Sequence, residues 1–283
     1  MRILMLHNLD RAAERIVMIE AGEVLKAAGA SIIIPQEDTD KLPDYMVRVA
    51  LDKALDIADA IVAIGGDGSI LKAAALASKK NIPILGINMG RLGFLSELEP
   101  NEVGELTRLA AGEYTIEKRM MLEAKVMRRG ETVYRSHGLN DAVLTRGPGC
   151  KVMEVDIYSD HQFIAKFRSD GVIISTPTGS TAYSLSAGGP IIDPTENNLT
   201  ITPICAHGLY AKSFVLAPTR QVTVGVRSMR SKYSYLSVDG KDDFEVHDDD
   251  LIVVKQSEYV TDMIKIKGRS VYDIVRDKMN YGI

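Results

Sequence analysis

The chain has 283 residues, of which 46% are hydrophobic and 25% are charged, as in an ordinary globular protein. These proportions exclude collagen-like, mucin-like and wholly disordered chains. No apolar run approaches the roughly 18–20 residues needed to cross a bilayer, so we expect no integral membrane protein. With 34 Lys and Arg against 38 Asp and Glu, the net charge of −4 argues against a broad nucleic-acid-binding surface.

The cysteines and the N-terminus predict a compartment. Cys150 and Cys205 lack the CxxC spacing of zinc sites, and two cysteines make no disulfide framework. The first apolar stretch, Ile3–Leu6, is too short for a signal peptide and is typical of a strand. We therefore expect a cytoplasmic protein with reduced thiols.

The first third of the chain alternates short apolar runs with helical patterns. The expected strands are Ile3–Leu6, Ser31–Ile34, Ala60–Ile64 and Ile82–Ile87, and the expected helices are Glu14–Ala28, Tyr45–Ala58, Ser69–Ser78 and Glu102–Ala111. Alternation with short connections predicts an α/β domain with a parallel sheet.

The rest of the chain is rich in strand patterns. We expect strands at Tyr114–Glu117, Met121–Arg128, Val133–Ser136, Ala142–Thr145, Glu154–Ser159, Gln162–Phe167, Val172–Ser175, Leu199–Ile204, Val222–Val226, Tyr233–Val238, Leu251–Val254 and Met263–Ile266, and a last helix at Ser270–Met279. The predicted organisation is an α/β domain at 1–100 and a β-rich, sandwich-like domain at 101–255. Residues 256–283 are expected to pack back on the first domain.

The loop Gly65-Gly66-Asp67-Gly68 lies between an expected buried strand and an expected helix. Ligands of open α/β sheets bind outside the carboxyl ends of the strands, where this loop falls. Its glycines allow a phosphate to approach backbone N–H groups at the helix N-terminus. A carboxylate beside a phosphate is repelled unless it takes a proton, binds Mg²⁺ or activates a hydroxyl, and each of these belongs to phosphoryl transfer. The alternative is a plain turn with an exposed Asp67.

Two further segments carry ligand-binding chemistry. The run from Thr176 to Pro190, TPTGSTAYSLSAGGP, combines small hydroxyl-bearing residues with one aromatic, Tyr183, which suits a pocket for a flat, polar ligand. Asn140 and Asp141 have the groups to bind an adenine edge and ribose hydroxyls, although by themselves they suit an ordinary turn better.

Together, the order and spacing of these three motifs resemble the NAD kinase family over essentially the whole chain. The glycine-rich loop is shared with diacylglycerol-type lipid kinases and the phosphofructokinase superfamily, whereas the TPTGSTAYSLSAGGP run is highly specific. The resemblance implies transfer of the ATP γ-phosphate to the 2′-hydroxyl of the adenosine ribose of NAD, which gives NADP.

The resemblance also implies roles for individual residues. Asp67 would be the catalytic residue that takes the proton from the 2′-hydroxyl. Gly65, Gly66 and Gly68 would form the phosphate loop. Asn140 and Asp141 match a pair that grips adenine and ribose, with Glu at the second position in many members. The implied NAD-binding residues are Asp67, Gly68, Lys72, Asn140, Asp141, Lys151, Arg168, Asp170, Thr178, Thr181, Ala182, Tyr183, Ser184, Leu185, Ser186, Cys205 and Lys241.

The same resemblance implies partners. Asp170, with Arg168 beside it, matches a carboxylate that contacts the second half of the dinucleotide. Because some contacts in this family cross between subunits, a homodimer or homotetramer is implied. Mg²⁺ is expected to arrive with ATP, without a protein metal cage or a tightly bound prosthetic group. The alternatives are a diacylglycerol-type lipid kinase and a non-catalytic NADP(H)-binding sensor.

Overall fold

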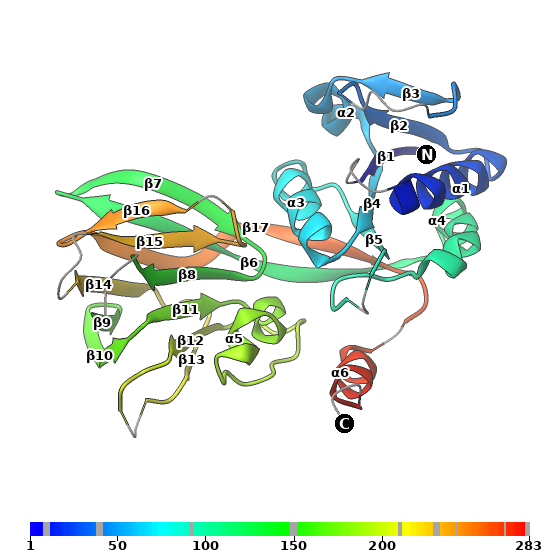
Figure 1. The fold of residues 1–283 in the computed structure, drawn as a ribbon. Coiled ribbons are helices and arrows are strands. Elements are labelled where there is room, and N and C mark those ends of the chain that lie inside the picture. The colour runs from blue at the N-terminus through cyan, green and yellow to red at the C-terminus, as the bar shows by residue number, and fades with distance from the viewer. Residues whose placement is uncertain are drawn as a thin grey trace. The chain divides into compact units, whose positions relative to one another are not determined.

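The computed structural model describes residues 1–7, 12–37, 42–90, 93–147, 152–208, 211–228, 233–241, 243–268 and 270–280. It forms two compact units, one of Met1–Lys118 with Thr261–Ile283 and one of Arg119–Val260 (Figure 1). In the described ranges, no helix combines the length and the apolar character needed to span a membrane.

The first unit is an α/β domain. Its elements are β1 (Arg2–Leu6), α1 (Ala12–Ala27), β2 (Ser31–Pro35), β3 (Met46–Val49), α2 (Leu51–Ile57), β4 (Ala60–Gly65), α3 (Asp67–Ala77), a 3₁₀ turn (Ser78–Lys80), β5 (Ile84–Asn88), a 3₁₀ helix (Pro100–Glu105), α4 (Leu106–Ala111) and α6 (Val271–Asn280). The strands run parallel in the order β5-β4-β1-β2-β3. The predicted parallel sheet is therefore confirmed.

Helices cover both faces of this sheet. On one face, alternate side chains such as Ile3 and Val62 share a buried cluster with Met18 of α1 and Leu109 of α4. On the other face, Ile70 of α3 lies so close to Gly86 of β5 that a Cβ there would overlap it. Burial on both faces explains why the strands read as continuous apolar runs.

The predicted helix Tyr45–Ala58 is wrong in its first half. Met46–Val49 forms the edge strand β3, which pairs in parallel with β2 through contacts such as Ile32↔Met46. Only then does α2 begin, at Leu51. Val47 and Val49 favour a strand, and pairing with the open edge of β2 makes this stretch a strand although its apolar spacing also fits a helix.

The second unit is a β-sandwich. Its elements are most of β6 (Thr115–Arg128), β7 (Glu131–Gly138), β8 (Asp141–Arg146), β9 (Met153–Ser159), β10 (Gln162–Ser169), β11 (Gly171–Ser175), a 3₁₀ helix (Thr178–Thr181), α5 (Tyr183–Ser186), β12 (Leu199–Ile204), β13 (Phe214–Leu216), β14 (Val222–Ser228), β15 (Tyr233–Val238), β16 (Phe244–His247) and the first part of β17 (Leu251–Lys265). One sheet has the order β13-β12-β11-β8-β15-β16, and the other contains β10-β9-β14-β17 with β6 and β7. Leu144 and Ile174 of the first sheet share one core with Val155 and Val224 of the second. The predicted β-rich, sandwich-like domain is confirmed.

Several strand boundaries differ from the expectation. Tyr114–Glu117 and Met121–Arg128 fall largely in one strand, β6, and Leu251–Val254 and Met263–Ile266 fall largely in another, β17. Polar residues in the middle of each long strand interrupt the apolar pattern without ending the strand. The short strands β13 and β16 were not predicted, because each offers too few residues for a periodic signal.

Candidate functional site

The glycine-rich loop joins β4 to α3 at the carboxyl edge of the parallel sheet (Figure 1). Gly65 has φ +147°, and a Cβ there would overlap the Ser69 hydroxyl, so this position requires glycine. Gly66 is the N-cap of α3, which starts at Asp67, two residues earlier than predicted. A Cβ at Gly66 or Gly68 would meet no atom within 4 Å, so the backbone here is open to a ligand.

Asp67 therefore lies in the first turn of α3, where backbone N–H groups have no partner within the helix and the helix dipole favours negative charge. Its carboxylate accepts hydrogen bonds from the backbone N–H of Phe94 at 3.0 Å and of Leu95 at 3.2 Å. A Cβ at Gly93 would overlap Asp67 Oδ1. The segment that follows β5 thus fixes the position of this carboxylate.

The last helix supplies a cation near this carboxylate. The ammonium of Lys278, in α6, lies 3.8 Å from the centroid of the Phe94 ring. Burial lowers the pKa of Lys278, and the charge of Asp67 acts in the opposite direction. Nothing in the sequence pointed to Lys278, because the fold alone brings α6 to the loop after β5. The predicted contact residue Lys72 is exposed on α3.

In the second unit, the segment Leu139–Asp141 joins β7 to β8 next to the Thr176–Pro190 run. The backbone N–H of Thr176 donates to the Asn140 carbonyl at 2.9 Å. Gly179 lies against the same carbonyl so closely that a Cβ there would overlap it. The two motifs, both predicted to contribute to the NAD site, are thus in direct contact.

Asn140 presents an unused acceptor. Its Oδ1 atom is buried and accepts no hydrogen bond from any residue that the structure describes. A buried acceptor without a donor is unfavourable by about 1–3 kcal/mol. An incoming N–H group, such as the exocyclic amine of adenine, would satisfy it.

Asp141 is buried, with 6% of its surface exposed. Burial, and in second place the charge of Asp239, raise the pKa of Asp141 to about 7. Across the sheet it pairs with Ser175, whose buried hydroxyl likewise has no partner among the described residues. This carboxyl changes its charge near neutral pH, and when it is ionised it can accept hydrogen bonds from the hydroxyl groups of a ribose.

The Thr176–Pro190 run divides its side chains between support and exposure. The Thr178 hydroxyl accepts a hydrogen bond from Arg119 at 3.3 Å, and the buried hydroxyl groups of Ser184 and Thr202 share a hydrogen bond of 3.0 Å. In contrast, Tyr183 is 44% exposed. Of the other residues predicted to line the NAD site here, Leu185 and Ser186 are exposed, and Thr181 and Ala182 are half-buried.

A second group of predicted contacts lies at the opposite end of β11. Asp170 directly precedes this strand and pairs with Arg146 at 2.8 Å, whereas Thr176 follows its far end. Cys205 is exposed, with φ +46°, directly after β12. Five strand residues separate the two ends by roughly 15–20 Å. The structure therefore does not bring Asp170 and Cys205 together with Asn140 and Asp141 within one chain.

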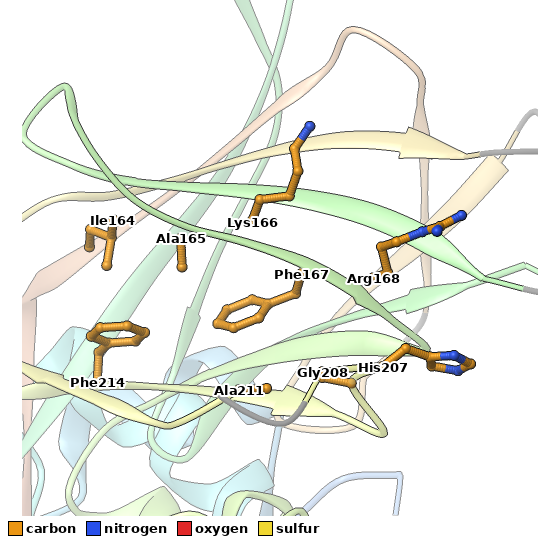
Figure 2. A pocket seen from close by; sticks show the side chains of 10 residues that line it. Ile164, Ala165, Lys166, Phe167, Arg168, His207, Gly208, Ala211 and Phe214 are labelled. Carbon is orange, nitrogen blue, oxygen red and sulfur yellow. The ribbon is translucent and has the colours of Figure 1, made fainter.

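Arg168 borders a cavity of about 390 Å³ at this end (Figure 2). Figure 2 shows the rings of Phe167 and Phe214 on one side of the cavity and the side chains of Arg168 and His207 at the other. Arg168 pairs with Glu154 at 3.5 Å, and its carbonyl accepts a hydrogen bond from the His207 N–H.

The remaining predicted residues are Lys241 and Lys151. Lys241 donates a hydrogen bond from Nζ to the His137 carbonyl at 3.0 Å, close to the Asn140 segment. Lys151 lies outside the described residues. Across the described part of the chain, no three His, Cys, Asp or Glu side chains converge to hold a metal ion.

Comparison with known families gives matches over most of the chain. The ATP-NAD kinase N-terminal domain matches residues 4–114, and the ATP-NAD kinase C-terminal domain matches residues 139–266. An NAD kinase of Carboxydothermus hydrogenoformans is 45% identical over 236 residues, which cover 83% of this chain and 84% of the relative. An NAD kinase of Moorella thermoacetica is 36% identical over 282 residues, covering 99% and 90%.

Solved structures agree in fold. Yeast NADH kinase complexed with NADH superposes with a TM-score of 0.85 at 22% identity, covering 99% of this chain and 87% of the yeast chain. An NAD kinase from Archaeoglobus fulgidus in complex with ATP gives 0.74 at 23% identity, covering 98% and 99%. At these identities, the likeness bears on the fold alone.

Proposed function

The chain belongs to the ATP-NAD kinase family, and on this premise we propose that Asp67 is the general base of its reaction. The enzyme is a phosphotransferase that acts on NAD. The observation that carries the proposal is the position of the Asp67 carboxylate. Two backbone N–H groups hold it beside Gly66 and Gly68, where no side chain would keep a ligand from the backbone.

In the proposed reaction, the 2′-oxygen of the adenosine ribose of NAD attacks the γ-phosphorus of ATP. A new P–O bond forms, the bond from the γ-phosphorus to the β,γ-bridging oxygen breaks, and ADP leaves. The 2′-hydroxyl proton passes to the Asp67 carboxylate, which contributes about 10²–10⁴-fold. Positioning and charge neutralisation supply the rest, because the transition state of phosphoryl transfer is loose. Mg²⁺ enters as part of the ATP substrate and neutralises phosphate charge.

The binding roles follow from the polar groups described above. Asn140 Oδ1 accepts from the adenine amine, and the ionised Asp141 accepts from a ribose hydroxyl. The exposed ring of Tyr183 offers a face for the base. The backbone N–H groups at the start of α3 donate hydrogen bonds to phosphate oxygens.

We also propose a homo-oligomer. Asp170, Arg168 and Cys205 stand at the other end of β11 from Asn140. They would contact the second half of an NAD molecule that is bound to the Asn140 segment of another copy. The cytoplasmic location expected from the cysteines stays a prediction.

One assay tests the activity. Purified protein is incubated with ATP, Mg²⁺ and NAD, and NADP formation is followed. The proposed function predicts NADP in amounts that depend on ATP. Phosphorylation of diacylglycerol instead of NAD would favour the lipid kinase, and NADP(H) binding without turnover would favour the sensor. The family matches support neither alternative.

A further inference from the structure

The backbone N–H groups of Leu139–Asp141, the segment proposed to bind adenosine, all donate to one side chain. Leu139, Asn140 and Asp141 donate from their backbone nitrogens to the carboxylate of Asp239, at 2.7, 2.8 and 3.2 Å. Successive N–H groups that converge in this way form a concave anion site. Here the anion comes from the chain itself.

The carbonyl groups of the same segment are equally fixed. The Thr176 hydroxyl donates to the Leu139 carbonyl at 2.5 Å, and the Thr176 N–H donates to the Asn140 carbonyl at 2.9 Å. The Asp141 carbonyl accepts from the Asp239 N–H at 3.0 Å. Two residues, Asp239 and Thr176, thus hold all six backbone polar groups, so the segment is fixed before any ligand binds.

Asp239 lies in the turn from β15 to β16 in a left-handed conformation, with φ +53°. Apart from glycine, asparagine and aspartate adopt this conformation most readily, because their short polar side chains can hydrogen-bond locally. On the other side of the contact, a Cβ at Gly138 would come within 2.8 Å of Asp239 Oδ1. The conformation of Asp239 and the lack of a side chain at Gly138 together make room for the Asp239 carboxylate beside Leu139–Asp141.

We propose that Asp239 is a positioning residue of the adenosine site, which holds the backbone of Leu139–Asp141 so that the Asn140 amide and the Asp141 carboxylate meet the base and ribose of NAD. The inference rests on the proposed function, because it takes these two side chains as the NAD contacts. Asp239 itself contacts no substrate in this account. It acts only through the segment.

Charge and position predict opposite effects for a substitution here. Burial raises the pKa of Asp239, while the three N–H groups and Lys241 act in the other direction. Its charge also helps to raise the pKa of Asp141. An Asp239→Asn substitution would remove that charge, which favours the ionised Asp141 and hence ribose binding. A loss of NAD affinity in this variant would therefore come from lost positioning.

The test compares Asp239→Asn with wild-type enzyme in steady-state kinetics and in backbone amide exchange. Asparagine tolerates the left-handed conformation, but its amide offers one acceptor oxygen instead of two. We expect the KM for NAD to rise about 10-fold or more, as displacement of a contact by about 1 Å can produce, with the KM for ATP within about 3-fold. The amides of Leu139–Asp141 should exchange faster.

The matched control is Asp250→Asn. Asp250 is also buried, accepts from the His247 N–H at 2.9 Å and pairs with Arg128 at 2.8 Å, and lies at the opposite end of the β15–β16 hairpin. It should leave the KM for NAD unchanged. If Asp239→Asn does not fold, Thr176→Val removes the hydrogen bond that the Thr176 hydroxyl donates to the Leu139 carbonyl, together with the one that it accepts from the Gly179 N–H, and should raise the same KM.

An unchanged KM for NAD in a folded Asp239→Asn enzyme overturns the inference, and so does an equal rise in both KM values. A wild-type protein that forms no NADP contradicts the proposed function instead. In that case the positioning role is read from NAD titration and amide exchange, where equal values for wild type and Asp239→Asn overturn it.

Discussion

The backbone N–H of Phe94 donates a 3.0 Å hydrogen bond to Asp67 Oδ2, and the neighbouring N–H of Leu95 donates to Oδ1. Each carboxylate oxygen thus has one fixed donor and keeps further lone pairs for a hydroxyl proton. The loop after β5 determines where this acid stands. The geometry of this loop, as much as the Asp67 carboxylate itself, should control the rate of phosphoryl transfer.

A Gly93→Ala substitution tests that control. The new Cβ would overlap Asp67 Oδ1, so the carboxylate must move. We expect kcat to fall at least about 10-fold, because displacements of about 1 Å strongly affect positioned groups. The matched control, Gly104→Ala, adds a Cβ at an exposed glycine with nothing within 4 Å and should leave kcat unchanged. Wild-type kcat in a folded Gly93→Ala enzyme would show that this loop does not position Asp67.

The affinity for NAD should depend on pH through Asp141. Its pKa of about 7 in the free protein means that the carboxyl is largely neutral below pH 7. Ribose hydroxyls donate to the ionised form, so binding is complete above about pH 7 and weakens as the pH falls, by up to about 10-fold per pH unit. Titrations of NAD between pH 5.5 and 8 check this. Asp141→Asn should bind weakly with no such pH dependence, and a flat wild-type profile contradicts the ribose contact.

The stability of the protein should follow the opposite trend. The folded-state pKa of Asp141 is raised from 3.8 to about 7, so its contribution to stability is fully present below pH 3.8 and is lost as the pH rises through 7. Asp141→Asn removes this dependence. Thermal melts should therefore show the variant more stable relative to wild type at pH 8 than at pH 5. An equal difference at both pH values would mean that Asp141 is not buried as described.

Mixed oligomers test whether Asp170 acts on a neighbouring copy. Asp67→Asn and Asp170→Ala should each be nearly inactive alone. Asp170 stands at the other end of β11 from Asn140. The proposal therefore builds each NAD site from Asp67 of one chain and Asp170 of another. Co-refolded mixtures should then recover activity, since some sites combine an intact Asp67 with an intact Asp170 from the partner. A mixture no more active than its parts contradicts this arrangement.

Local sequence patterns could predict only those parts of the proposed site that are continuous in the sequence. The strand–loop–helix around Asp67 and the Thr176–Pro190 run are both continuous in sequence, so glycines and small residues reveal them. Long-range partners leave no such signal. Lys278 reaches the Phe94 ring only because α6 packs there, and Asp239 meets Leu139 only through the pairing of β15 with β8.

Fold errors have the same origin. Met46–Val49 has an apolar spacing that fits a helix, and only the open edge of β2 makes it a strand. The helix α3 begins at Asp67 instead of Ser69, so Gly68, which looks like a loop residue in the sequence, lies in the first helical turn. Neither outcome follows from periodicity alone.

Rapid-quench measurement of a single turnover with Asp67→Asn tests the central claim most directly. Enzyme saturated with NAD is mixed with MgATP, and the rate of NADP formation is recorded beside the dissociation constant for NAD. General-base action predicts a rate at least about 100-fold below wild type, with NAD binding within a few-fold. A wild-type rate of NADP formation in this variant would contradict the assignment of Asp67 as the base.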